Sequence, residues 1–237
     1  MTKEMIYLYK TLSLGFAYPQ EANWIMFEDL LSACRDLPEG DVSSALMDFK
    51  SYFLANRRRV RDMESEYLRI FDMGRVISPY ETEYLHEKIS RKPYELADIA
   101  GFYQAFGFDV SDGAEQREPV DHIAVELEFM AILAYKELYA EEKHQADHLA
   151  IVREGQKKFL HEHLARWGFF YCSRIQGIEC DEYYKHLGKV LHALLTAECE
   201  THGLDVSCYQ RDADRSVPAE AHDDVSACGQ HLPVGGM

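Results

Sequence analysis

The sequence lacks the long apolar runs, leader pattern and cysteine pairs that mark membrane, exported and disulfide-bonded proteins. No stretch approaches the ~20 uninterrupted apolar residues that a membrane-spanning helix needs. The segment Met1–Lys10 has no basic region followed by an apolar run, so we expect no secretory signal. None of the six cysteines forms a C-x-x-C pair, and in a reducing compartment such residues are typical of ordinary core thiols. We therefore expect a cytoplasmic protein without membrane insertion.

Positive charge is scarce. The 25 lysines and arginines face 41 aspartates and glutamates, which gives a formal net charge of -16. An acidic surface repels phosphate backbones and anionic lipid, so nucleic acid is not an expected partner. It favours a basic partner, such as an arginine-bearing peptide. At 237 residues and 47% hydrophobic, the chain can build one core, shared by one domain or two small lobes.

Alternating strand patterns are also missing, whereas apolar residues recur every three to four positions. The fold class is therefore all-α, a single helical bundle. Asp41 is a suitable N-cap for the third helix, which contains the basic run Arg57–Arg59. The periodicity predicts helices over residues 3–17, 21–34, 42–71, 93–107, 119–143, 146–176 and 181–203.

The organisation of the domain follows from two features of this pattern. The helix at 119–143 is apolar on two faces, which indicates a central, buried position. A polar loop precedes it, and a hinge near residues 109–121 would divide the bundle into two lobes. From Asp205 onward the apolar pattern ends, so we expect an all-helical domain at 1–204 and a mobile polar tail at 205–237.

The first candidate site lies at Tyr67–Gly74 and the following segment Ser78–Tyr84. An aromatic helix end here runs into a proline loop that carries carboxylates. These residues are suited to an apolar groove with an acidic rim, the complement of an apolar peptide flanked by arginines. The alternative is that the aromatic side chains cover the core.

The second candidate is the start of the helix at 119–143. Pro119 suits a first helical turn, and Glu118 and Asp121 suit the positive end of the helix dipole. Glu126 follows His122 by one turn, so both lie on one face. The alternative is a well-capped helix start with a surface His122–Glu126 pair.

The third candidate is the segment His161–His163, followed by Trp167. On a helix the two histidines diverge by about 200° and do not readily share an ion. The chain has no H-E-x-x-H motif and no phosphate-binding G-x-x-x-x-G-K loop. We therefore predict no catalytic residue, metal or cofactor. A metal-handling reading would rest on tail residues whose spacing matches no standard zinc finger, namely Cys208, His222, Cys228 and His231.

Together, these motifs resemble the TorD-like redox-enzyme maturation chaperones, a group that includes DmsD- and NarJ-type proteins. The family signal is an aromatic helix end, a proline–aromatic loop, an E-P-x-D-H motif and an H-L-x-x-W segment. The resemblance covers roughly residues 5 to 200. The matching positions are Tyr67-x-x-Ile70-Phe71, Pro79-Tyr80, Glu118-Pro119-x-Asp121-His122 and His163-Leu164-x-x-Trp167.

The resemblance implies an all-helical cytoplasmic chaperone that is not an enzyme. Such proteins bind the twin-arginine signal, or its remnant, on a molybdenum-containing oxidoreductase of the DMSO-reductase type. They hold that partner back from export until its molybdopterin cofactor is inserted. The peptide-binding positions carried over are Tyr67, Ile70, Phe71, Pro79, Tyr80, Glu118, Asp121 and His122.

The arginines of such a signal should meet carboxylates, for which Asp121, Glu118 and Glu81 are the candidates. Tyr67 and Ile70 replace the tryptophan and leucine of some members, which would retune signal preference. A monomer is expected, or a dimer that swaps domains through the hinge. The alternative function is a helical adaptor that binds the mature partner without signal specificity.

Overall fold

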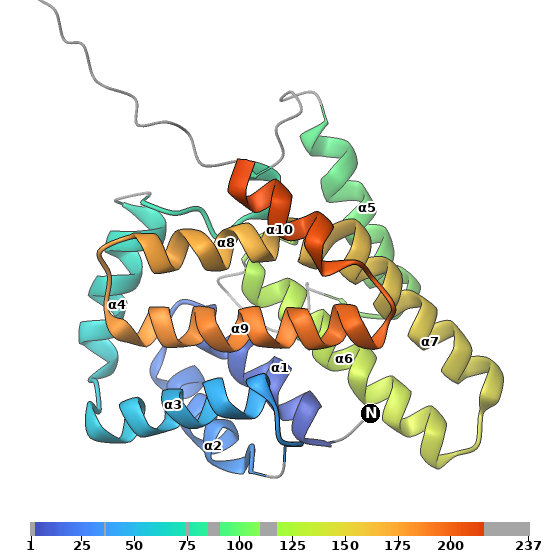
Figure 1. Cartoon of the computed structure of the whole chain (residues 1–237), viewed down its shortest axis with the longest axis horizontal. Coiled ribbons are helices and arrows are strands. Elements are labelled where there is room, and N and C mark those ends of the chain that lie inside the picture. Colours follow the sequence, from blue (N-terminus) through green and yellow to red (C-terminus); the bar gives the residue numbers. More distant parts are fainter. Residues whose placement is uncertain (1–2, 36, 74–75, 85–90, 110–117, 216–237) are drawn as a thin grey trace, which may run out of the picture.

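The computed structural model describes residues 3–35, 37–73, 76–84, 91–109 and 118–215. These ranges are helical and contain no β-strand, which confirms the all-α prediction (Figure 1). Short π-helical turns η1 (Leu68–Asp72) and η3 (Leu160–Leu164) and the 3-10 turn η2 (Glu81–Glu83) interrupt the α-helices. The helices are α1 (Lys3–Phe16), α2 (Glu21–Ala33), α3 (Asp41–Ala55), α4 (Val60–Tyr67), α5 (Lys92–Ala105), α6 (Ile123–Glu142), α7 (Ala146–Phe159), α8 (Ala165–Gly177), α9 (Glu182–Thr201) and α10 (Val206–Arg215).

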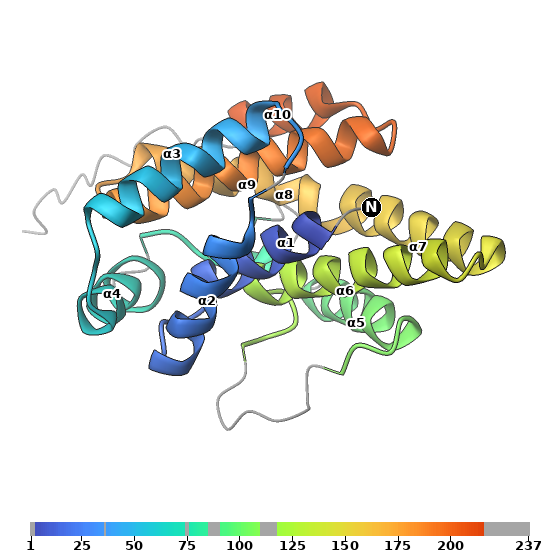
Figure 2. The same cartoon turned by 90° about the horizontal axis from the view of Figure 1, so that it is seen from below.

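Helix α6 was predicted to be central and buried, and this holds for its first part: residues 123–134 are almost all buried, whereas Tyr135 and Tyr139 near its end are exposed. It packs along α1 and pairs with α7 (Figure 2). Helix α9 packs between α3 and α8 (Figure 1). The buried side chains form one continuous cluster that extends from Leu8 in α1 to Tyr209 in α10. The described residues therefore share one core. Residues 110–117, at the predicted hinge, lie outside the described residues, so the hinge stays a prediction.

The prediction of one continuous helix over residues 42–71 is wrong. It is divided into α3 and α4, and the basic run Arg57–Arg59 lies in the linker between them. Asn56 ends α3 by donating its side-chain amide to the Tyr52 carbonyl oxygen at 3.0 Å. Arg58 then binds the Asp181 carboxylate at 2.7 Å. A long-range ion pair therefore holds the linker against the start of α9.

The predicted caps of two helices also need correction. Asp41 is the first residue of α3, and Gly40 is its N-cap. Helix α6 begins at Ile123 rather than at Pro119, because the His122 side chain accepts the backbone N–H of Ala124 at 3.1 Å. Pro119 instead belongs to a turn in which its carbonyl oxygen accepts the His122 N–H at 3.0 Å.

The C-terminal part is helical for longer than predicted. The segment 146–176 is helical as expected, with η3 joining α7 to α8. Beyond Asp205, however, the chain forms α10 rather than an immediate polar tail. Tyr209 is buried, and its hydroxyl lies 2.6 Å from His161 Nδ1. The buried Tyr209 side chain therefore packs α10, a mostly polar helix, against the core. The rest of the predicted tail, 216–237, lies outside the described residues.

None of the helices in the described part of the chain combines the length and apolar character that a bilayer crossing requires.

Candidate functional site

The proline–aromatic loop is attached directly to the start of α6. Tyr80 and His122 form an isolated antiparallel β-bridge. The Glu81 N–H donates to the Asp121 carbonyl oxygen, and the Ile123 N–H donates to the Pro79 carbonyl oxygen, both at 2.9 Å. The first and second motifs of the sequence are therefore parts of one structure, although about 40 residues separate them.

His122 is the fully buried centre of this structure. Its Nδ1 accepts the Ala124 N–H, so the ring proton resides on Nε2. Nε2 lies 3.1 Å from the Tyr67 hydroxyl, to which it donates. Burial lowers the pKa of His122 to about 3, so the imidazole is neutral at physiological pH. The Tyr80 ring meets the imidazole edge to face, with centroids 5.3 Å apart.

The alternative of a surface His122–Glu126 pair is wrong. Both side chains are fully buried, and each has another partner. Glu126 Oε2 accepts the indole N–H of Trp167 at 3.1 Å. Burial, followed by the nearby charge of Glu81, raises the pKa of Glu126 well above its usual value. Glu126 is therefore a neutral, protonated acid beneath the site.

Asp121 and Glu81 hold the loop from the inside. The Asp121 carboxylate is buried and accepts the Thr82 hydroxyl at 2.6 Å. Glu81 is completely buried, and it accepts from Arg166 at 2.9 Å and contacts His163 Nδ1 at 3.2 Å. These contacts explain the third motif: His163 on η3 and Arg166 on α8 both contact Glu81, and the Arg166 guanidinium balances the charge of this loop carboxylate.

One group in the described ranges has the donor atoms of a metal site. Ligand atoms of Glu81, Glu95 and His163 lie within 4.8 Å of one another. Arg166, however, donates to both carboxylates, at 2.9 Å to Glu81 and 3.0 Å to Glu95. The guanidinium therefore supplies the positive charge that a metal ion would bring. Among the tail residues considered for metal binding, Cys208 is described and exposed, while the other three lie outside the described residues.

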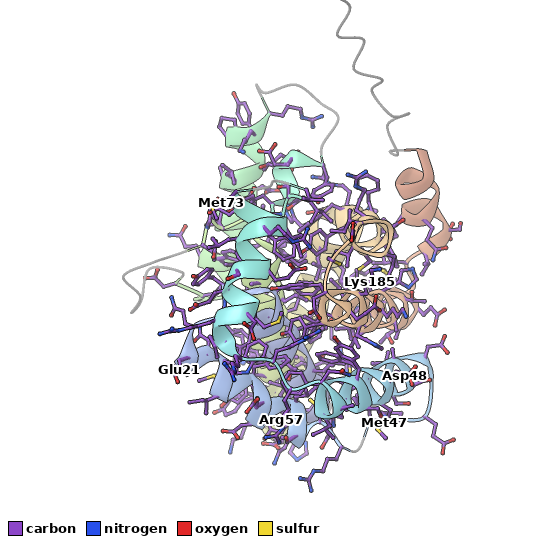
Figure 3. The ribbon with its side chains drawn as sticks, turned by 90° about the vertical axis from the view of Figure 1, so that its left-hand side faces the viewer. Glu21, Met47, Asp48, Arg57, Met73 and Lys185 are labelled. Carbon is purple, nitrogen blue, oxygen red and sulfur yellow. The ribbon has the colours of Figure 1, made fainter. Side chains whose placement is uncertain are left out.

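A pocket of about 640 Å³ opens on the outer side of the bridge. Its walls come from the end of η1, the loop, the start of α5 and the turn before α6. The end of η1 is at the surface, where Met73 projects outward (Figure 3). The lining residues are Phe71, Asp72, Ser78, Tyr80, Glu83, Lys92, Leu96, Pro119, Val120 and Asp121.

The predicted site residues therefore divide into two groups. Phe71, Tyr80 and Asp121 line the pocket. Glu118 is half-buried nearby, and burial and then the charge of Asp72 raise its pKa. The remaining predicted residues are buried behind the pocket wall and support it, namely Tyr67, Ile70, Pro79, Glu81 and His122.

Sequence reasoning missed part of the lining. Asp72 directly follows the predicted Phe71, and its position at the end of a helix was the available signal. Lys92 and Leu96 come from the first turns of α5, and no local pattern connects them with the loop. Arg166 was likewise missed, because its partner Glu81 is 85 positions away in the sequence.

The described part of the protein is all-helical, and its proline–aromatic loop is joined to the start of helix α6. A family model described as nitrate reductase delta subunit matches residues 36–171. The chain belongs to this family, the TorD-like maturation chaperones. The matched region contains all the motifs on which the resemblance rests.

Individual relatives agree with this assignment. The perchlorate reductase assembly chaperone protein of Dechloromonas aromatica is 26% identical over 167 residues, which cover 68% of this chain and 72% of the relative. The selenate reductase assembly chaperone protein of Thauera selenatis is 31% identical over 138 residues, covering 57% and 67%. The probable nitrate reductase molybdenum cofactor assembly chaperone NarW of Escherichia coli is 27% identical over 125 residues, covering 52% and 49%.

Proposed function

We propose that this chain is a cytoplasmic assembly chaperone for a molybdenum-containing oxidoreductase subunit of the DMSO-reductase type. It binds the N-terminal twin-arginine-type signal of that subunit and assists cofactor insertion before export. It carries out no catalysis itself. The family and the assembly roles in the relatives' names support the chaperone role, and the pocket supports the peptide specificity.

The observation that carries this proposal is the bridge between Tyr80 and His122. It brings the two motifs together at one pocket and places the Tyr80 ring in the pocket wall beside Phe71. The lining mixes two aromatic and three aliphatic residues with polar and charged ones, which suits an apolar segment flanked by basic side chains. The signal's apolar stretch therefore docks along Phe71, Tyr80 and Pro119.

The arginines of the signal require carboxylates that can reach them. Asp121 and Glu81 already serve internal partners, as described above. Glu118 and Asp72 are near enough for the charge of Asp72 to raise the pKa of Glu118, and Asp72 is exposed. A guanidinium between them would relieve this repulsion and donate charge-assisted hydrogen bonds to both carboxylates. Glu118 and Asp72 therefore bind the arginines, while Asp121 and Glu81 position the loop.

Calorimetric titration with a synthetic twin-arginine signal peptide tests the proposal. A copy with both arginines changed to lysine should bind about tenfold more weakly, because lysine cannot make the bidentate contact. Glu118→Gln and Tyr80→Ala should each weaken binding of the arginine peptide, whereas Glu154→Gln, on the exposed surface of α7, should not. If neither peptide binds to the folded wild-type protein, the proposed signal specificity is contradicted.

A second candidate function is an adaptor that binds the mature partner. A pocket of about 890 Å³ lies between α5, α6 and α7, and its wall includes Phe106, Tyr135, Tyr139 and Ile151. Three of these side chains are exposed, and such apolar surface often marks a protein interface. An adaptor would still bind a partner that lacks its signal, and Ile151→Asp would abolish that binding.

A further inference from the structure

A second pocket lies at the end of α6, beside its turn into α7 (Figure 1). Its walls come from α5, α6 and α7, and its volume is about 890 Å³. Tyr135 in its wall is about 20 Å along the axis of α6 from His122. A partner at this surface rests on the second candidate function and is independent of signal binding.

The rim of this pocket carries large apolar side chains that are open to solvent. Tyr135, Tyr139 and Ile151 are 58%, 46% and 59% exposed. Ala140 and Val152 also line the pocket and are buried. Large apolar side chains that gather at one surface typically mark an interface. Helices α6 and α7 therefore present a hollow apolar surface that a second apolar surface would bury.

The wall from α5 is fixed by a close approach between two helices. The ring of Phe106 lies against Gly155 of α7, where an added Cβ would come within 2.3 Å of the ring. Glycine is unfavourable inside a helix, and here it makes room for the ring. Phe106 also meets Phe129, with centroids 6.0 Å apart. The shape of the pocket is therefore present before a partner binds.

The charge of this pocket is opposite to that of the protein as a whole. The net charge is -16, yet the described lining contains Lys136 and neither aspartate nor glutamate. Lys136 forms no ion pair or hydrogen bond within the described ranges. A second ammonium group, that of Lys143, lies 5.7 Å from the centroid of the Tyr139 ring. An unpaired cation in an apolar pocket is suited to a carboxylate from a partner.

We propose that this pocket binds an amphipathic helix of a partner polypeptide that carries a carboxylate beside its apolar face. The apolar side chains of that helix cover Tyr135, Tyr139 and Ile151, as in other helix-in-groove interfaces. The carboxylate pairs with Lys136. The partner segment is therefore opposite in charge to an arginine-bearing signal, so the two pockets bind different segments.

Calorimetric titration of the full chain with three synthetic helical peptides tests this proposal. Each peptide has leucine and alanine on one face, with glutamate, glutamine or lysine beside that face. The net charge of the protein repels the glutamate peptide and attracts the lysine peptide. A contact with Lys136 reverses this order, so we expect the glutamate peptide to bind about fivefold more tightly than the glutamine peptide. The lysine peptide should bind most weakly.

Three results of this titration would overturn the proposal. They are equal binding of the glutamate and glutamine peptides, tightest binding of the lysine peptide, and the absence of saturable binding by all three.

Variants locate the binding. Ile151→Asp should weaken binding of the glutamate peptide by about tenfold or more, because it places a charge in the apolar contact. Lys136→Gln should make the glutamate and glutamine peptides bind alike. Lys189→Gln, on the exposed surface of α9, is the matched control and should change neither affinity. Unchanged binding by Ile151→Asp, with its fold verified by circular dichroism, would overturn the location.

Glu118→Gln distinguishes this surface from the signal pocket. The glutamate peptide should bind to this variant as tightly as to the wild-type protein. Binding that is lost in Glu118→Gln but retained in Ile151→Asp would place the peptide in the signal pocket and overturn this inference. Failure of the signal peptide to bind, by contrast, would leave this inference intact.

Sedimentation velocity of the full chain tests whether a second copy of the chain covers the pocket. We expect the distribution of oligomers to be the same for the wild-type protein and Ile151→Asp. A dimer that Ile151→Asp dissociates would overturn the proposed partner and assign the pocket to self-association.

Discussion

The imidazole of His122 donates a hydrogen bond to the hydroxyl of Tyr67 across 3.1 Å, and this contact joins the end of α4 to the start of α6. The phenol and the imidazole are both buried, and burial raises the pKa of Tyr67 as it lowers that of His122. Both groups are therefore neutral at physiological pH. A hydrogen bond between two neutral groups, and not an ion pair, therefore fixes the orientation of the His122 ring.

Tyr67→Phe should destabilise the protein by about 1–3 kcal/mol, because it leaves the His122 N–H buried without an acceptor. Urea unfolding followed by circular dichroism measures the change. Tyr135→Phe, which removes a hydroxyl from an exposed ring, is the control and should change little. Equal stability of the two variants would contradict the hydrogen bond.

The buried carboxyl of Glu198 predicts a specific pH dependence. Its folded-state pKa of about 7 lies above its ordinary value of 4.5, so the folded protein retains a proton that the unfolded chain releases. Stability is therefore lost as pH rises from 4.5 through 7. Glu198→Gln removes this loss, and its stability relative to wild type should grow from near zero at low pH to about 3 kcal/mol at pH 8. Urea unfolding of both proteins at pH 5 and pH 8 measures it, and a constant difference would contradict it.

Arg166 should be more important for stability than ordinary surface arginines. Arg166→Met leaves Glu81 buried without its guanidinium partner, and we expect a loss of about 2 kcal/mol because Arg166 itself is partly exposed. The control is Lys92→Met, which breaks the exposed pair with Glu83 and should change stability little. Chemical unfolding compares the two variants, and similar losses would show that Glu81 does not depend on Arg166.

Removal of the Arg166 guanidinium should create a metal site. In Arg166→Ala, the ligand atoms of Glu81, Glu95 and His163 remain close together without a competing positive charge. Zinc should therefore raise the Tm of this variant and leave that of the wild-type protein unchanged, because binding to the folded state stabilises it. Thermal unfolding with and without added zinc measures this effect. A rise in the wild-type protein would show that the metal displaces Arg166.

The local sequence pattern predicted the helices well where the spacing of neighbouring apolar residues determines them. The spacing of apolar residues placed α1, α2, α6 and α9, and Pro93 correctly indicated the first turn of α5. The start of α6 was misplaced because its cap is His122, a residue that caps helices less often than serine or aspartate. The break before α4 was missed because Arg58 finds its partner, Asp181, in a distant part of the chain.

In the candidate site, too, the contacts between distant parts of the chain could not be predicted from the sequence. The resemblance to the family placed the loop and the start of α6 in one site, and the bridge between Tyr80 and His122 brings them together. It could not distinguish residues that face the pocket from those behind it, because both groups share the same motif. The internal roles of Asp121 and Glu81 follow from Thr82 and Arg166, whose contacts depend on the complete fold.

The long reach of these contacts has a consequence for synthesis on the ribosome. The loop at Glu81 is held by Asp121, which is 39 or 40 positions later, and by Arg166, which is 85 positions later. Each of these contacts needs both partners to have been synthesised, and closing the long chain segment between them costs entropy. The pocket is therefore complete only after α8 has left the exit tunnel and packed. A nascent or truncated chain that ends before Arg166 would have the aromatic motif but not the fixed loop, so partly made molecules should not compete for the partner.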